Sequence, residues 1–234
     1  MSLTYAIADL HGRYDLLGMA FEKIAAHAAG KQATIITMGD YIDRGQRSRE
    51  IIEKLMAGDP APNLRLVCLQ GNHEQIMLIC CAAPGRIEWW VRNGGGATLI
   101  SYGNPVGDFA NPSLIPIEHL RWAFELPKYY EDAHRIFVHA GVKDGVKLGD
   151  QDDEILLWML YPDGDKGGYG SKHVVHGHHQ FENGPLLFSG RTDLDTFAWW
   201  TGRLVVGVFD DELAGGPIEL ISIVGPTFRE LRDA

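Results

Sequence analysis

The segment Gly39-Asp-Tyr-Ile-Asp-Arg-Gly45 (GDYIDRG) directly follows the apolar run at 33–38. A short apolar run that ends at a glycine is typical of a buried β-strand. This strand would deliver three charged side chains, Asp40, Asp43 and Arg44, just beyond its carboxyl end. The two glycines would permit the tight turn that such a placement needs.

Four more predicted strands end in the same way. Residues 4–8 precede Asp9-Leu10-His11-Gly12, 64–69 precede Gly71-Asn72-His73-Glu74, 135–138 precede His139-Ala140-Gly141, and 172–175 precede His176-Gly177-His178-His179. Apolar residues at helical spacing predict helices at 16–28, 48–57 and 73–82, so strands and helices alternate as in an α/β core. Open α/β sheets bind ligands beyond the carboxyl ends of their strands, so we expect these polar side chains to converge.

The middle and the end of the chain have other patterns. Residues 84–127 contain Trp89, Trp90, a glycine run at 94–96 and prolines at 105, 112 and 116. We interpret them as helical pieces and loops inserted between core strands. Residues 187–224 form short β-like runs between glycine turns, and we predict that they close a second sheet as antiparallel strands.

The composition fits a globular protein and disfavours several functions. Of 234 residues, 45% are hydrophobic and 22% are charged, and no apolar run approaches the ~18 residues that span a bilayer. The formal charge of −10 disfavours broad binding to nucleic acids or anionic membranes. The first ten residues lack the basic start of a signal peptide. Cys68, Cys80 and Cys81 are too few for a disulfide framework, so we predict reduced thiols and a cytoplasmic location.

The residue types at the strand ends favour a metal site. Carboxylates, imidazoles and an amide, without thiolates, suit divalent manganese, iron or zinc. A bridging carboxylate can hold two ions that activate water between them. Each motif alone also has an ordinary explanation, such as Asp40 as a helix cap or Glu74 as a favourable charge at a helix N-terminus. The occurrence of all five motifs, each after a strand, is what favours one shared site.

Together these motifs resemble those of the calcineurin-like metallophosphoesterases. The narrower similarity is to the serine/threonine phosphoprotein phosphatase group, with its bacterial and phage members and the symmetrical diadenosine tetraphosphatases. It rests on GDYIDRG (39–45), GNHE (71–74), WVRNGG (90–95), SYG (101–103), FVHAG (137–141), LDT (194–196) and GRL (202–204). The resemblance implies an α/β fold in which a two-sheet β-sandwich is flanked by helices, with metals at one end of the sandwich. It also implies a single domain over 1–234, with residues 84–127 as a cap-like insertion beside the site.

The resemblance assigns metal-binding roles to the matching residues. Two divalent metal ions are implied, with manganese as the first expectation and iron or zinc as alternatives. The implied ligands are Asp9, His11, Asp40, Asn72, His139 and His178. Asp40 would bridge the two ions. His176 and His179, beside the last ligand, are expected at the rim of the site and not on the metals.

The other matches imply hydrolysis of phosphomonoesters. A metal-bound hydroxide would attack phosphorus directly, and His73 would protonate the leaving oxygen as general acid. Asp43 would orient His73 and raise its pKa. Arg44 and Asn72 would bind the substrate phosphate. The implied substrate is a phosphorylated protein or a small phosphoester, and we expect a monomer that binds neither membranes nor nucleic acids broadly.

Leu160 departs from the family pattern. The family often carries a second phosphate-binding arginine two residues after a tryptophan, where this chain has the leucine of LLWML (156–160). Either another cation, for example Lys166 or Lys172, takes the place of the arginine, or the protein prefers a different substrate. Two alternatives therefore stay open. One is a hydrolase of diadenosine tetraphosphate or a related nucleotide, and the other is a metal-binding scaffold with a decayed site. The tryptophans that could stack on a nucleotide base are Trp89, Trp90, Trp199 and Trp200.

Overall fold

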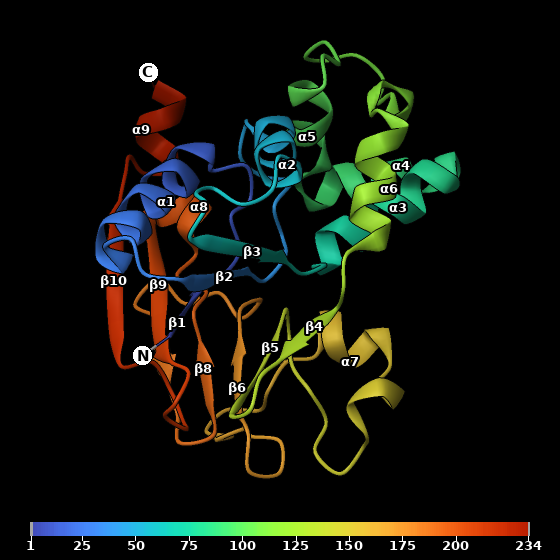
Figure 1. The fold of residues 1–234 in the computed structure, drawn as a ribbon. Coiled ribbons are helices and arrows are strands. Elements are labelled where there is room, and N and C mark those ends of the chain that lie inside the picture. The colour runs from blue at the N-terminus through green and yellow to red at the C-terminus, as the bar shows by residue number, and fades with distance from the viewer. Residues whose placement is uncertain (1, 234) are drawn as a thin grey trace.

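Two five-stranded β-sheets form the centre of the protein (Figure 1). The computed structural model describes residues 2–233. The first sheet has the strand order β10-β9-β1-β2-β3 and the second has the order β4-β5-β6-β8-β7. The strands are β1 (Leu3–Ile7), β2 (Ala33–Thr37), β3 (Leu64–Cys68), β4 (Tyr129–Glu131), β5 (Arg135–Val138), β6 (His173–His176), β7 (Leu186–Leu187), β8 (Arg191–Asp193), β9 (Arg203–Asp210) and β10 (Glu219–Val224).

The helices lie mainly on the outer face of the first sheet and beside it (Figure 1). They are α1 (Tyr14–Ala28), α2 (Ser48–Met56), α3 (Asn72–Ala82), α4 (Ile87–Trp90), α5 (Gly96–Ser101), α6 (Ile117–Glu125), α7 (Asp153–Trp158), α8 (Ala198–Thr201) and α9 (Phe228–Asp233). The strands and helices that periodicity predicts in the first 82 residues are all present to within two residues. No helix within residues 2–233 is both long and apolar enough to cross a membrane.

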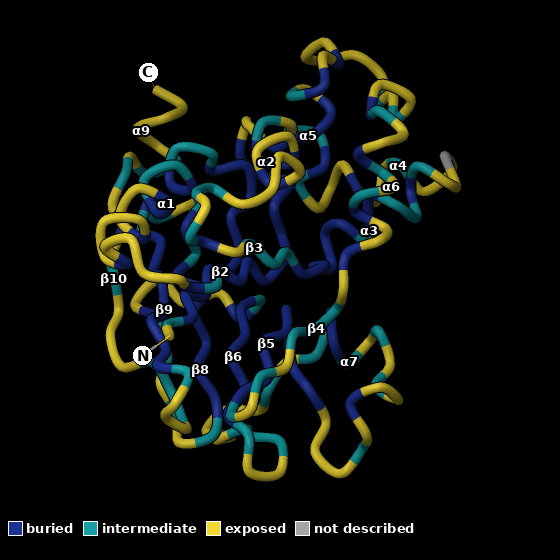
Figure 2. Tube along the Cα trace, viewed as in Figure 1, coloured by how far each residue is buried: buried dark blue, intermediate teal, exposed yellow. Residues whose placement is uncertain are grey.

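Alternation along the strands builds three apolar layers. On β1, Tyr5 and Ile7 pack among the helices, whereas Ala6 faces the second sheet, as the two-residue period of a strand requires. Between the sheets, Ala6 lies in one cluster with Phe137 of β5 and Phe209 of β9. A third cluster joins the outer face of the second sheet to α7. Figure 2 shows the buried residues concentrated along these strands. The predicted two-sheet α/β fold flanked by helices is confirmed.

The prediction for residues 187–224 is partly wrong. Strands β7 and β8 do join the second sheet, but β8 runs parallel to β6. Strands β9 and β10 instead extend the first sheet, where β9 lies antiparallel to β1. Seven of the eight residues of β9 are buried, because this strand is covered on both faces. Local alternation marks a segment as a strand but carries no information on which sheet it joins.

The segment 84–127 packs beside the first sheet. It contains the predicted helical pieces, and α4, α5 and α6 contact α2 or α3 (Figure 1). A π-helical turn at Val91–Gly95 connects α4 to α5, and it bends at Gly94, whose φ is 105°. The cap-like role of this segment and the single domain over 1–234 remain predictions, and residues 1 and 234 lie outside the described range.

Candidate metal centre

The loops that follow the strands have an unusual backbone. Within residues 2–233, seven non-glycine residues have a positive φ, and five of them are predicted site residues. These five are His11 (40°), Asp40 (52°), Asp43 (72°), Arg44 (68°) and His178 (67°). Such backbone strain typically persists at functional sites, where the surrounding structure holds it in place. The sharp bends that it reflects lie next to the carboxyl ends of β1, β2 and β6.

Glycines allow the loops to pack directly on one another. A Cβ atom on Gly71 would lie 2.3 Å from the backbone nitrogen of Asp40, and one on Gly177 would lie 2.2 Å from Oδ1 of Asp9. Real Cβ atoms do not approach other atoms so closely. The glycines of the quoted motifs are therefore required for the approach of the acidic side chains to the neighbouring loops.

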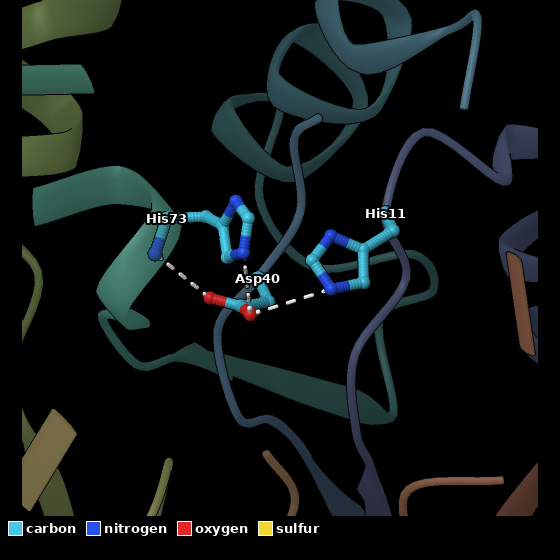
Figure 3. A group of neighbouring side chains, drawn as sticks. All are labelled: His11, Asp40 and His73. Atoms are coloured by element: carbon cyan, nitrogen blue, oxygen red, sulfur yellow. Dashed lines mark hydrogen bonds and ion pairs between the residues drawn. The ribbon is translucent and has the colours of Figure 1, made fainter. Parts of the chain in front are cut away.

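The carboxylate of Asp40 lies at the centre of the cluster. His11 Nε2 is 3.4 Å from Asp40 Oδ2, and His139 Nε2 is 3.5 Å from Asp40 Oδ1. His73 Nε2 is 3.8 Å from Asp40 Oδ2. Figure 3 shows the rings of His11 and His73 side by side, both turned toward this carboxylate, and their centroids are 4.7 Å apart. Two groups able to hold a metal ion share Asp40: one contains His11 and His73, and the other contains His139 and His178.

Hydrogen bonds fix the tautomers of the two histidines nearest Asp40. His11 Nδ1 lies 2.8 Å from the carbonyl oxygen of Ile42, and His139 Nδ1 lies 2.8 Å from that of Met38. Because a carbonyl oxygen only accepts, each Nδ1 carries the proton and each Nε2 presents a lone pair toward Asp40. A backbone carbonyl behind the ring is the usual support of a metal-binding histidine.

Several atoms of the cluster lack a partner that the protein could supply. Asp9 Oδ2 and His11 Nε2 are buried without a hydrogen bond. The amide of Asn72, in contrast, finds partners when its oxygen and nitrogen are exchanged, because the nitrogen then donates to Asp40 at 3.1 Å and to His139 Nε2 at 2.9 Å. The unpartnered carboxylate oxygen and ring nitrogen are electron-pair donors that a bound cation would satisfy. The nitrogen and oxygen donors present therefore fit a divalent metal ion.

Burial favours the neutral form of His11 and of His178. It lowers the pKa of His11 well below its usual value and that of His178 to about 3. Burial and, second, the charge of Asp40 raise the pKa of Asp9. A neutral imidazole is the form that binds a metal ion, so these histidines are ready to act as ligands. The carboxylate of Asp9 does not belong to either group around Asp40, but its Oδ1 accepts the backbone N–H of His178 at 3.1 Å.

His73 and Asp43 form a buried pair next to this cluster. His73 Nδ1 lies 2.6 Å from Asp43 Oδ2. The same carboxylate accepts hydrogen bonds from Trp90 Nε1 at 2.9 Å and from Thr98 Oγ1 at 2.7 Å. Burial alone would lower the pKa of His73, but Asp40 and Asp43 outweigh it and raise that pKa. Arg44 Nη2 lies 3.2 Å from His73 Nε2, so the predicted phosphate-binding arginine is next to the predicted acid.

Glu74 plays a part that the sequence motifs did not predict. Its buried carboxylate accepts the backbone N–H groups of Asp40, Tyr41 and Gly71, each at 2.9 Å. Burial and the charge of Asp40 raise the pKa of Glu74 to about 7. This side chain therefore ties the loop after β2 to the start of α3. The glutamate of GNHE is the only sequence signal for this role, and by itself it predicts no more than a favourable charge at a helix N-terminus.

Two side chains lie elsewhere than predicted. His176 is fully buried within β6, where it lies 2.8 Å from the carbonyl oxygen of Gly177 and 3.0 Å from Arg191 Nη1, so its expected place at the rim is wrong. Trp90 is fully buried against Asp43 and cannot stack on a substrate base. Trp199, in contrast, lies under Arg44, with the guanidinium carbon 5.7 Å from the ring centroid.

The side chain at the position of the missing arginine is apolar. Leu160 is 65% exposed. Lys172 precedes β6, at the end of the strand away from the site, where its amine contacts the carbonyl oxygen of Asp132 and lies 3.1 Å from Glu131 Oε1. Lys172 therefore does not replace the arginine. Lys166 is exposed.

The fold and this cluster define a two-sheet α/β protein with a buried histidine and aspartate metal site. The chain belongs to the Calcineurin-like phosphoesterase family, which it matches over residues 3–216. It is therefore a metal-dependent phosphatase, an enzyme that hydrolyses phosphoesters.

Solved structures share this fold at low sequence identity. One, described as a "putative diadenosine tetraphosphatase", has a TM-score of 0.62 and 19% identity, covering 95% of this chain and 93% of its own. A mutant cold-active protein tyrosine phosphatase has a TM-score of 0.61 and 15% identity, and the match covers 87% of this chain and 74% of the other. A protein serine/threonine phosphatase from Saccharomyces cerevisiae has a TM-score of 0.59 and 14% identity, covering 96% and 80%.

Proposed function

We propose that the protein is a dinuclear phosphomonoesterase that works with manganese and resembles the serine/threonine protein phosphatases in its chemistry. The observation that carries this proposal is that the lone pairs of His11 and His139 meet at Asp40 while Arg44 and the His73–Asp43 pair border the same point. A metal cluster, an anion-binding group and a proton donor in one place suit hydrolysis of a phosphate ester.

The proposed ligands divide into two sets around Asp40. Asp9 and His11 would hold one ion, Asn72, His139 and His178 the other, and Asp40 would bridge them. Bound divalent ions supply Lewis acidity and a water molecule of lowered pKa. Iron and zinc suit the same donors and are the alternative metals.

The protein's own side chains would bind the phosphate and protonate the leaving group. Arg44 offers a planar fork for two phosphate oxygens, with Asn72 as a further contact. In the structure Arg44 Nη2 is 3.2 Å from His73 Nε2. When Arg44 turns to the phosphate, Nε2 is free to carry a proton to the leaving oxygen. Asp43 holds the opposite ring nitrogen, so the imidazole stays oriented toward the substrate. Because no nucleophilic serine or cysteine is needed, hydrolysis would proceed without a phosphoenzyme.

Diadenosine tetraphosphate, or a related nucleotide, is the second candidate substrate. Trp199 beside Arg44 supports it, because an indole next to a phosphate site could receive a base. The exposed Leu160, where the phosphatase group often has an arginine, also favours a substrate other than a phosphoprotein. A decayed scaffold is disfavoured, because every side chain that the mechanism needs is present and buried or partly buried around Asp40.

Three substrates assayed in parallel test the proposal. The protein loaded with manganese is given p-nitrophenyl phosphate, a phosphoserine peptide and diadenosine tetraphosphate. Hydrolysis of the first two supports the monoesterase, and cleavage of the tetraphosphate alone supports the second candidate. If bound manganese is demonstrated and none of the three is hydrolysed, the scaffold is correct. Asp40→Asn is the matched inactive variant, since it keeps the size of the residue and removes the bridging charge.

The setting of the enzyme is also proposed. Cys68, Cys80 and Cys81 are free, which supports a reducing, cytoplasmic environment. We propose a monomer of one domain in which residues 84–127 act as a cap beside the site. The contact between Gly94 and Arg44 supports this cap, because the carbonyl oxygen of Gly94 accepts the backbone N–H of Arg44 at 3.1 Å.

A further inference from the structure

A cavity lies beside the loops that carry His11 and Arg44. It has a volume of about 220 Å³. Gly12 and Gly45, the residues that follow His11 and Arg44, form part of its wall, and the C-terminal helix α9 closes another side. Ligand pockets for drug-sized molecules measure ~300–1,000 Å³. This cavity, the C-terminal pocket, therefore suits one ring system whose remaining atoms lie outside it.

Aromatic side chains line the pocket. Trp199 and Phe228 both lie in its wall, with ring centroids 5.3 Å apart. The indole nitrogen Nε1 of Trp199 is buried and has no hydrogen-bond partner among the described residues. A buried donor without an acceptor is costly, and a ring nitrogen or carbonyl oxygen of a ligand would satisfy it after a small adjustment. An apolar wall with one free donor matches the chemistry of a heteroaromatic base.

Three arginines line the pocket, and each of them has a carboxylate partner. Its wall contains Arg13, Arg47 and Arg232 against one acidic residue, Asp15, in a chain with a net charge of −10. Arg13 and Asp15 neutralise each other at 2.7 Å. Arg47 is paired with a glutamate on α2, and Arg232 with Asp233 at 3.2 Å. The pocket is therefore close to electrically neutral, and the exposed pair of Arg232 is the one in which a phosphate could replace the carboxylate.

Trp199 connects this pocket to the proposed phosphate site. Its indole lines the pocket and also lies 5.7 Å from the guanidinium carbon of Arg44. A ring against Trp199 would therefore contact the same indole as Arg44, whose guanidinium group is the proposed binding site for the anionic part of the ligand. Nucleoside polyphosphates combine these two parts, whereas a phosphoserine side chain has no ring to place there.

We propose that the C-terminal pocket binds the base of a nucleoside polyphosphate substrate whose phosphate chain reaches Arg44. The proposal rests on the proposed phosphoesterase function and names its substrate class. The base stacks on the aromatic wall of Trp199 and Phe228, and Arg232 attracts the phosphate chain. A phosphomonoester without a base uses only the site at Arg44 and the metals.

Substitutions on α9 test this proposal without changing the metal site. Phe228→Ser removes one aromatic wall, and Arg232→Glu reverses an exposed charge at the pocket. Arg229→Glu is the matched control, since Arg229 is exposed on the same helix and does not line the pocket. The measured quantity is the ratio of kcat/KM for diadenosine tetraphosphate to that for p-nitrophenyl phosphate, with manganese present. Loss of base stacking should lower this ratio about 5- to 150-fold in Phe228→Ser.

The charge reversal should lower the ratio about two- to fivefold, as for an exposed ion pair, and the control should leave it unchanged. If both pocket variants keep the wild-type ratio, or if the wild type hydrolyses p-nitrophenyl phosphate but not the tetraphosphate, the proposal is overturned and the phosphoesterase function stands. If neither substrate is hydrolysed, the phosphoesterase function fails. Calorimetric binding of ADP then decides on the pocket: binding that Phe228→Ser weakens supports it, and absence of binding overturns it.

Discussion

Replacing Asp43 by asparagine should slow the chemical step without removing the metals. The carboxylate accepts hydrogen bonds from His73, Trp90 and Thr98, at 2.6, 2.9 and 2.7 Å. An asparagine of the same size must turn its NH₂ group toward one of these donors, so at least one charge-assisted bond is lost. Such a bond contributes about 1.5–3 kcal/mol. If its loss falls on the protonated form of His73, kcat decreases about 10- to 150-fold.

The assay compares two leaving groups. Phosphoserine releases a basic alkoxide that needs a proton, whereas p-nitrophenyl phosphate releases a weakly basic phenolate. The decrease in kcat for Asp43→Asn should therefore be larger for the phosphoserine peptide. Asp153→Asn is the matched control, because Asp153 is half-exposed on α7 and pairs with Lys128. An equal decrease with both substrates, or unchanged kcat with metals demonstrably bound, would refute the role of Asp43 in supporting the acid.

Three further outcomes are expected. Gly94→Ala should impair phosphate binding and stability more than Gly103→Ala. Both glycines have a positive φ (105° and 94°), but only a Cβ at Gly94 would approach Arg44, at 2.8 Å. The KM and the urea midpoint are measured for the two variants, and equal changes in both quantities would contradict the contact. Chelation should lower the melting temperature by about 5–11 °C, since metal at 100 times its Kd stabilises by ~2.7 kcal/mol; an unchanged melting temperature would exclude a tightly bound metal. In the metal-free protein, the free energy of unfolding of the wild type relative to His178→Asn should decrease as the pH falls from ~6.5 toward 3. The folded-state pKa of His178 is about 3, so the unfolded chain binds the proton more tightly in this range. Denaturation at several pH values checks this, and a constant difference in free energy would contradict it.

The elements that carry the site were predictable because their signals are local. The apolar run before GDYIDRG and the helical spacing after GNHE gave β2 and α3 to within one residue. The convergence of their polar residues followed from the rule that strands of an α/β sheet end at one edge. Strands β9 and β10 were assigned to the wrong sheet, because hydrogen bonding to β1 depends on residues about 200 positions away.

The hydrogen bonds and the burial of individual side chains at the site could not be predicted from local sequence signals. The bonds from Glu74 to the loop after β2 join residues about 30 positions apart, and nothing in the motif spacing indicates them. Trp90 and Trp199 are both tryptophans near glycines in the sequence. Only packing distinguishes them, because one is fully buried on Asp43 and the other lies between Arg44 and the C-terminal pocket.

The sequence by itself determined the fold class, the order of the motifs and the choice of nitrogen and oxygen ligands, because each depends on residue type and short spacing. The tertiary structure decided which lone pairs face Asp40, that Lys172 does not take the place of the missing arginine, and how α9 forms a pocket beside the loop that carries Arg44. These depend on side chains from distant segments that meet only when the chain is folded. The GDYIDRG loop illustrates both levels. Its residues can be recognised in the sequence alone, whereas its strained backbone is maintained only by contacts with neighbouring segments of the folded chain.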